Sequence, residues 1–171
     1  FTNYTPNQGW KLIGFHLRPR WAVPQEWNLP LGMSISAEIG WQQAKYSAET
    51  FSLELRPIFD KTIGKLYASF NPTLGFGFKG VGSSKSPEIA PSFKLAYSAS
   101  PKVSVGTEYY SSLGTLRKLN PIQQEEHALY VVADLFVDPK WEINFGAGKG
   151  LTNATDGLVL KLILGRRIMW K

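Results

Sequence analysis

The chain has 171 residues and no cysteine, so neither a disulfide framework nor a thiolate metal site can form. It also has no apolar run close to the roughly 18–20 residues of a membrane-spanning helix. The longest candidate, GLVLKLILG at 157–165, is short and interrupted by Lys161. A run of like charges is absent too. The formal net charge is +6, but the basic residues are scattered, which argues against nucleic acid as a partner.

Nucleotide-binding motifs fail as well. In WEINFGAGKGLT, residues 141–152, the pair Gly148 and Lys149 is followed by glycine, whereas a phosphate-binding loop requires Ser or Thr. GFGFKG at 75–80 fits a dinucleotide-binding glycine pattern by letter, but no helix is predicted after it. The two histidines are far apart in sequence, so a histidine-rich metal site is not expected. The sequence therefore predicts no cofactor and no metal.

What the chain does contain is aromatic residues and glycine. Six Trp, seven Tyr, ten Phe and sixteen Gly form a composition typical of all-β chains, and the length suffices for one domain. No signal peptide is visible, and because the chain opens on Phe1 we expect a mature or truncated start.

Apolar and polar residues alternate along nearly the whole chain. In LPLGMSISAEIGW, the seven odd positions from Leu29 to Trp41 are apolar and the even positions are mostly small or polar. This period of two is that of a strand with one apolar face. Nine strands of about 9–13 residues are predicted, at 10–20, 29–41, 51–59, 66–78, 87–98, 102–111, 126–137, 140–150 and 157–168. If these strands close into a single-chain membrane barrel, an even count is required, and we then expect a further strand in FTNYTPNQ or before Phe1.

Two classes fit such a pattern, a soluble barrel or sandwich and an outer-membrane barrel. Soluble strands usually have about 5–6 residues, whereas tilted membrane strands need about 9–11, as predicted here. Short links also alternate with long ones, as in outer-membrane barrels. The short links are 59–64, 98–102 and 138–140, and the long ones are 42–50, 79–88 and 112–125; 21–28 and 151–156 fit less well. We predict an all-β fold, an antiparallel transmembrane β-barrel domain over 1–171 with nine or ten visible strands. The total is even, and 12 if strands precede residue 1.

Proline tests this prediction because it cannot donate to a ladder and a closed barrel has no free edge. Four prolines, Pro19, Pro30, Pro57 and Pro91, are expected near strand ends. Pro72 falls within a predicted strand and is expected to mark a bulge.

Three stretches, 55–76, 92–116 and 125–168, resemble a family of Gram-negative outer-membrane β-barrel proteins. The family is mostly uncharacterised and is grouped with porin-like transporters. The similarity matches the C-terminal two-thirds of that family and extends over about 10–168 of this chain. It implies the fold, a bacterial outer-membrane location and further strands upstream, but its strand and turn motifs carry no catalytic signature. The C-terminus departs from the pattern of many outer-membrane proteins, because it ends on Lys171 instead of an aromatic residue.

The charged residues of the strands fall on the polar face by parity, with both signs in similar number. They predict either a structural network of ion pairs or the lining of a selective pore, and the second becomes more favourable as strand number grows. The predicted lumen-lining residues, with His16 beside them, are Arg18, Glu38, Glu54, Arg56, Lys94, Glu108, Asp134, Glu142, Lys161 and Arg167.

Aromatic residues are expected in two girdles at the membrane interfaces. Those predicted at the short-link end are Trp21, Trp27, Phe59, Tyr97, Trp141 and Trp170. Those predicted at the long-link end are Trp41, Phe76, Phe78 and Tyr109.

His127 raises the question of catalysis, because with Ser111 or Ser112 and a neighbouring glutamate it could form a Ser–His–acid set. The alternative, which we favour, is an interfacial histidine beside a loop.

We expect a non-enzymatic outer-membrane barrel, a porin-like passive channel or a structural barrel. A lipid-modifying enzyme and an accessory subunit scaffolding a membrane complex are the alternatives. Expected partners are outer-membrane lipids and lipopolysaccharide, and protein partners if the chain is a scaffolding subunit. The lysines and arginines of the long-link end either contact lipopolysaccharide phosphates or are solvated loop charges.

Overall fold

The computed structural model describes residues 2–5, 9–81, 83, 86–138 and 140–166. Almost all regular structure is β, and the helical part of the described residues is one 3-10 turn, η1 (Gln25–Trp27). No described helix is long and apolar enough to cross a membrane. The described strands are β1 (Thr2–Thr5), β2 (Gly9–Leu12), β3 (Gly14–Leu17), β4 (Arg20–Ala22), β5 (Gly32–Gln42), β6 (Phe51–Ile63), β7 (Leu66–Asn71), β8 (Leu74–Lys79), β9 (Glu88–Ile89), β10 (Ser92–Ser100), β11 (Val103–Ser112), β12 (Gly114–Thr115), β13 (Lys118–Leu119), β14 (Glu126–Leu135), β15 (Trp141–Gly150) and β16 (Val159–Arg166).

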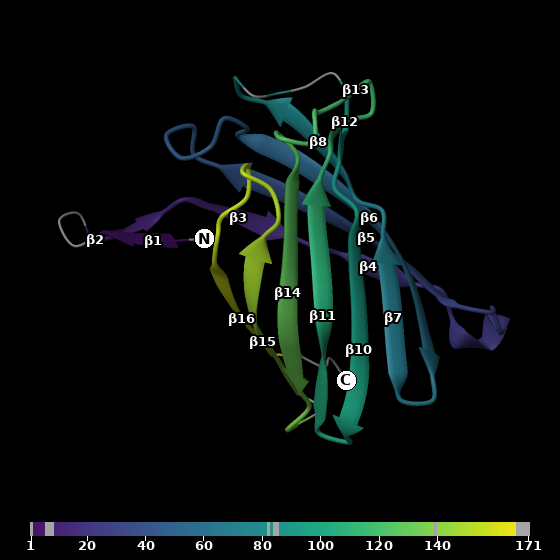
Figure 1. Ribbon diagram of the computed structural model, residues 1–171. Coiled ribbons are helices and arrows are strands. Elements are labelled where there is room, and N and C mark those ends of the chain that lie inside the picture. Colours follow the sequence, from purple (N-terminus) through teal and green to yellow (C-terminus); the bar gives the residue numbers. More distant parts are fainter. Residues whose placement is uncertain (1, 6–8, 82, 84–85, 139, 167–171) are drawn as a thin grey trace.

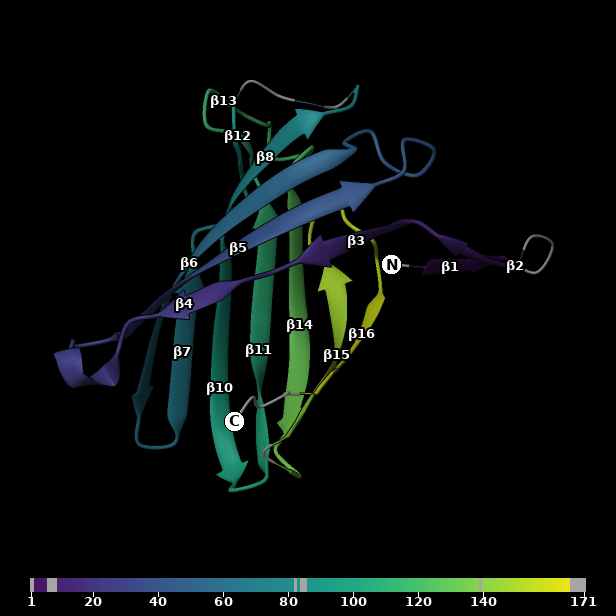
Figure 2. The same cartoon turned by 180° about the vertical axis from the view of Figure 1, so that it is seen from behind.

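The main sheet is an antiparallel meander in which each long strand pairs with the next one along the chain (Figure 1). The order is β3 and β4 together, then β5, β6, β7 with β8, β10 with β9, β11 with β12, β14, β15 and β16. The small β13 pairs with β12, and β1 forms a separate hairpin with β2 (Figure 2). The predicted all-β antiparallel fold is confirmed, and the nine predicted segments correspond to the nine positions of the meander.

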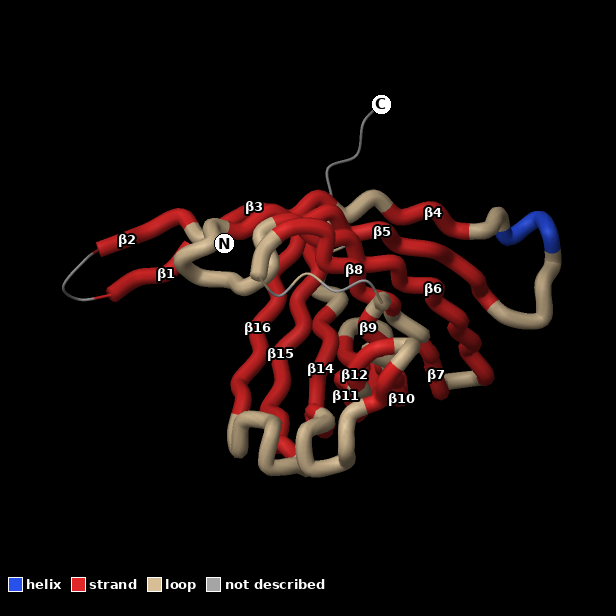
Figure 3. Tube along the Cα trace, turned by 90° about the horizontal axis from the view of Figure 1, so that it is seen from above, coloured by secondary structure: helices blue, strands red, loops and turns tan. Residues whose placement is uncertain are grey.

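The sheet is curved but not closed. Viewed from above, its strands follow an arc (Figure 3). No ladder among the described residues joins the β3–β4 edge to the β16 edge. The predicted closed barrel is therefore not formed within the described part of the chain. A strand does exist in FTNYTPNQ, at β1, but it pairs with β2 outside the main sheet.

Prolines interrupt two neighbouring strands. Pro72 lies in the break between β7 and β8, and Pro91 lies in the break between β9 and β10. The two breaks meet where the Ala90 amide donates to the Thr73 carbonyl at 2.9 Å. The expectation for Pro57 is wrong, because β6 continues past it to Ile63. Pro57 is tolerated within β6 since it lies between the stretch paired with β8 and the stretch paired with β7.

The two faces of the sheet show the reverse of a water-soluble pattern. On β14, Leu129 and Val131 are 43% and 68% exposed, whereas the alternate residues Ala128 and Val132 are 8% and 3% exposed. Across the described residues only three hydrophobic side chains are buried, all Ala or Val, against nine polar or charged ones. The interior of this molecule is therefore its polar face, and its large apolar side chains point outward.

Candidate functional site on the polar face

Glu108 of β11 is the centre of a buried ion-pair cluster. It is 5% exposed, and its carboxylate contacts two lysines from other strands. Lys94 of β10 lies directly opposite in register, with Nζ 3.0 Å from Oε1, and Lys161 of β16 binds Oε2. The Tyr110 hydroxyl also donates to Oε2 at 2.8 Å. Two cations and a neutral donor thus compensate the burial of one carboxylate.

Asp134 of β14 is a second acidic partner of Lys94, so the two lysines of the cluster are balanced by two carboxylates. Lys94 Nζ is 2.7 Å from Asp134 Oδ2, and the Asn144 side-chain amide of β15 donates to Asp134 Oδ1 at 2.7 Å. Asn144 is itself only 5% exposed. The cluster of Lys94, Glu108, Asp134, Asn144 and Lys161 spans five consecutive strands, with two positive and two negative charges. It therefore cross-links half the sheet without leaving a net charge.

Aromatic rings pack around the same cluster. Tyr110 and Tyr130 meet edge to face at 5.5 Å, and Lys161 Nζ lies 5.5 Å and 5.7 Å from their ring centres. The Tyr130 ring occupies the space above Gly148, where an added Cβ would come within 2.3 Å of it. This explains the glycine-rich WEINFGAGKG stretch, which forms the strand β15: its glycine makes room for a ring from the adjacent strand.

A second cluster lies on the first strands of the meander. Glu38 of β5 and Glu54 of β6 lie directly opposite one another, and each carboxylate has its own cation. Glu38 contacts His16 at 2.6 Å and also Arg18, whereas Glu54 contacts Arg56 at 2.5 Å. Without these cations, two carboxylates facing each other across a ladder would repel.

The curvature of the sheet brings distant strands of the meander together on the polar face. Lys161 on β16 binds the Glu108 carboxylate on β11, although β14 and β15 lie between these strands. The inside of the curve is therefore narrow enough for side chains to reach across two intervening strands.

Eight of the ten charged residues that were predicted to line a lumen form direct ion pairs, and Arg18 does so with a side chain that is half exposed. The eight are Arg18, Glu38, Glu54, Arg56, Lys94, Glu108, Asp134 and Lys161. Glu142 is exposed and faces Gly165 across the ladder. Arg167 lies outside the described residues. That these residues line a lumen stays a prediction.

Sequence reasoning missed Tyr110, Tyr130 and Asn144, because only charged positions were selected. All three share the parity of Glu108 and Asp134 along their strands, so alternation alone would have placed them on the same face.

The outward aromatic residues gather in small groups. Trp41 packs on Phe15 at 5.8 Å, and Phe78 lies 6.3 Å from Phe76. Cations cover two rings near the short links, with Lys65 6.0 Å from Tyr97 and Arg166 5.6 Å from Trp141. Trp21 and Trp27 are 56% and 61% exposed, and Trp170 lies outside the described residues.

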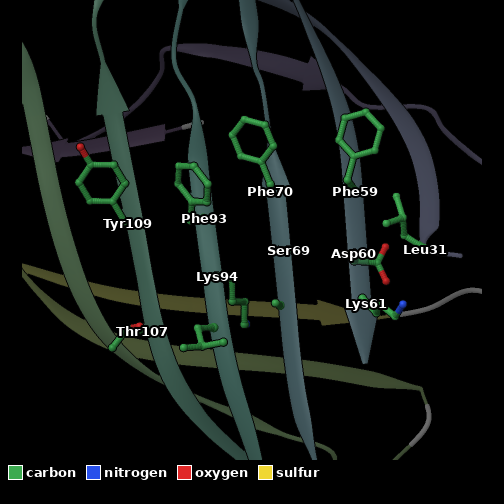
Figure 4. Close-up of a pocket in the computed structure, with 12 residues that line it drawn as sticks. Leu31, Phe59, Asp60, Lys61, Ser69, Phe70, Phe93, Lys94, Thr107 and Tyr109 are labelled. Atoms are coloured by element: carbon green, nitrogen blue, oxygen red, sulfur yellow. The ribbon is translucent and has the colours of Figure 1, made fainter. Parts of the chain in front are cut away.

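Phe59 departs from its predicted end of the sheet. Phe59, Phe70, Phe93 and Tyr109 lie in register across β6, β7, β10 and β11 and form one row (Figure 4). The sequence assigned Phe59 and Tyr109 to opposite girdles. The difference arises because β6 continues to Ile63, which moves the turn away from Phe59. Membership of the other aromatic residues in interfacial girdles stays a prediction.

His127 is held between an acid and a tyrosine. Its Nε2 lies 2.9 Å from Glu125 Oε2, and its Nδ1 is hydrogen-bonded to the Tyr109 hydroxyl at 2.5 Å. The Ser111 hydroxyl donates to the Pro91 carbonyl at 2.9 Å instead. The His127 ring thus contacts an acid and a tyrosine, whereas the Ser–His–acid hypothesis requires a serine in contact with the histidine.

The link 43–50 reaches over the polar face at its long-link end. The Glu49 carboxylate lies above Gly77 of β8, where an added Cβ would be 2.3 Å from Oε1. Burial raises the pKa of Glu49 above its ordinary value of 4.5, and the nearby charge of Glu88 adds to the effect.

Among the described residues, no group of three or more His, Asp or Glu side chains is arranged to hold a metal ion. Comparisons of the chain with models of protein families, with curated proteins and with solved structures found no match. The resemblance to outer-membrane barrel proteins therefore stays a prediction.

Proposed function

We propose that this chain forms the wall of a porin-like transmembrane β-barrel in a bacterial outer membrane, with lipid outside and a charge-paired polar lumen inside. The observation that carries the proposal is the inverted distribution of side chains. Large apolar residues are exposed along one face, while Glu108 and Asn144 are buried on the other. In a membrane barrel, lipid covers the apolar face and the polar face surrounds the lumen.

The strand lengths support this assignment. β11, β14 and β15 each have 10 residues. At about 3.3 Å per residue and a tilt of about 40°, such strands rise about 25 Å, which matches the apolar band of outer-membrane barrels. A water-soluble sheet of this size would expose these apolar residues at a large cost in solubility.

The strand directions determine what the proposed barrel needs in order to close. Because neighbours are antiparallel throughout, the β3–β4 edge and the β16 edge run in the same direction. Direct pairing of these edges would be parallel. An odd number of additional strands, antiparallel to both edges, completes an antiparallel ring with an even total. Lipid requires such closure, because unpaired backbone groups are costly there.

The lumen of such a barrel is narrow and crossed by ion pairs. The cluster around Glu108 links five strands, and Lys161 reaches Glu108 across two intervening strands. We therefore propose a passive channel of low conductance whose selectivity depends on these paired charges.

Conductance across a planar bilayer tests the proposal, using the complete gene product folded in detergent. We expect small, steady steps, with ion selectivity changed in opposite directions by Glu54→Gln and Arg56→Gln. Vesicle insertion, measured by protection from added protease, is the control for folding. Protein that does not insert would contradict the membrane assignment. Protein that inserts but conducts in neither parent nor variants would contradict the channel and leave a structural barrel.

A second candidate, an accessory subunit in a larger membrane complex, is favoured by the two edge strands. Under this proposal a partner protein contributes the strand that lies between β16 and the β3–β4 edge. Co-purification from mild detergent tests it: a partner that is lost when proline replaces residues of β16 would support the subunit role.

A further inference from the structure

The outward face contains one further feature, an apolar groove across β6, β7, β10 and β11 (Figure 4). The row of rings formed by Phe59, Phe70, Phe93 and Tyr109 makes one wall. Four strands at about 4.8 Å spacing give the groove a length of about 14 Å. Its volume, 390 Å³, lies within the range of roughly 300–1,000 Å³ that small-ligand sites occupy.

The groove exists because short side chains follow the aromatic row. The next outward row is Lys61, Ala68, Leu95 and Thr107, in register across the same strands. Ala68 and Thr107 lie on either side of Leu95 and are much shorter than the rings beside them. The short side chains therefore leave a depression between the rings and the outward side chains beyond them, and Ala68 and Thr107 are exposed in it.

The aromatic wall presents carbon to the groove. The one hydroxyl in the row, that of Tyr109, is already hydrogen-bonded to His127 at 2.5 Å. Phe70 and Phe93 stack at 4.6 Å and Phe93 lies 6.2 Å from Tyr109, so the wall is continuous. A ligand that follows this wall is therefore apolar along its length.

A cation lies at one end of the groove. Lys61 of β6 is outward and exposed, and within the described part of the chain no ion pair involves it. Asp60 also lines this end of the groove, but its carboxylate lies against Gly32 of the neighbouring strand β5, where an added Cβ would be 2.8 Å from Oδ2. An apolar channel with a lysine at one end is complementary to a ligand with an apolar chain and an anionic head.

We infer that this groove binds one acyl chain of an anionic phospholipid, with the lipid phosphate at Lys61. The inference rests on the proposed function, because a lipid reaches this face only if the sheet lies in a membrane. It goes further by assigning a specific lipid site to four strands of the wall. Elsewhere on the outward face, lipid contact is expected to be unspecific and rapidly exchanging.

Native mass spectrometry of the full protein tests the site, after folding into mixed vesicles of phosphatidylglycerol and phosphatidylcholine and extraction into mild detergent. The parent is expected to retain one phosphatidylglycerol. Ala68→Trp fills the groove and should abolish the lipid-bound peak. Ala147→Trp is the matched control, because Ala147 is an exposed outward alanine of the same cross-strand row, two strands beyond Thr107. Thr107→Trp replaces Ala68→Trp if the latter does not fold.

Charge substitutions test the position of the head group. Lys61→Gln should retain a lipid but lose the preference for phosphatidylglycerol over phosphatidylcholine, whereas Lys149→Gln, at an exposed outward lysine of β15, should keep the preference. An unchanged lipid peak in both groove variants, or an equal loss in Ala147→Trp, would overturn the inference. A dimer peak lost in Ala68→Trp would also overturn it and identify a second copy as the occupant.

Vesicle insertion of the parent separates the two proposals. If the parent is protected from protease in vesicles and the groove variants keep their lipid, the groove inference alone fails. If the parent does not insert, the proposed membrane function fails and the lipid site fails with it.

Discussion

Replacing Glu108 by glutamine removes one charge from the centre of the ion-pair cluster while keeping the shape of the side chain. Lys94 retains Asp134 as a partner, but Lys161 loses its acidic partner. Glu108 and Lys161 side chains are 6% and 18% exposed, so the remaining cation is poorly hydrated. Removing one partner of a buried pair costs about 3–5 kcal/mol. We expect about 3 kcal/mol, the lower end, because Tyr110 can still donate to the glutamine oxygen.

Glu54→Gln is the matched control, because Glu54 and Arg56 are 31% and 28% exposed and their pair is accessible to water. Such a pair contributes about 0–1 kcal/mol. The assay is urea unfolding in lipid vesicles, followed by tryptophan fluorescence. The double variant Glu108→Gln with Lys161→Met should recover part of the loss, because it removes the uncompensated cation. Equal losses for Glu108→Gln and Glu54→Gln, or no recovery in the double variant, would refute the reasoning.

Three further predictions concern the loop, the strand β15 and the histidine. Burial and the charge of Glu88 raise the pKa of Glu49, so its protonated form stabilises the position of link 43–50 above Gly77, and this contribution is lost as pH rises above 4.5. Amide exchange in the link, corrected for intrinsic rates, should therefore be faster at neutral pH, and Glu49→Gln should remove the pH dependence. Gly148→Leu should prevent folding into vesicles or lower the unfolding midpoint strongly, since its side chain would overlap the Tyr130 ring; an unchanged midpoint would contradict the packing. His127→Gln should leave vesicle insertion and conductance unchanged, and any lipid hydrolysis measured with the parent should be unchanged too. Loss of lipid hydrolysis in a folded His127→Gln variant would instead favour the enzyme.

Alternation along the chain was sufficient to predict the all-β fold and the nine positions of the meander. It worked because a strand has a period of two and one face of this sheet is apolar throughout, as in β14 and β15. Alternation does not predict which residues of two neighbouring strands pair, or at which residue a strand ends and its turn begins. The placement of Phe59 was wrong for that reason, since β6 runs to Ile63 and pairs Phe59 with Phe70.

The candidate site was predicted in part. Parity placed Glu108, Lys94 and Lys161 on one face, but the contact between β11 and β16 crosses two intervening strands. Such a contact depends on the curvature of the sheet and on side-chain length. The alternation of apolar and polar residues along one strand predicts neither of them. The position of Glu49 above Gly77 depends on the path of a link, which has no periodicity at all.

The proline breaks divide part of the wall into two units. The break between β7 and β8 and the break between β9 and β10 lie side by side at Thr73 and Ala90, while β6 continues past them without interruption. Among the described residues, β8, β9, β12 and β13 pair with one another and with β6, so local opening of this panel of four strands would break no ladder pair of β7, β10 or β11. Local opening in proteins follows such cooperative units. β6, which pairs with both β7 and β8, would then act as the hinge about which this panel moves toward the long links. The ladders of β7, β10, β11, β14, β15 and β16 and the ion pairs among these strands would stay intact.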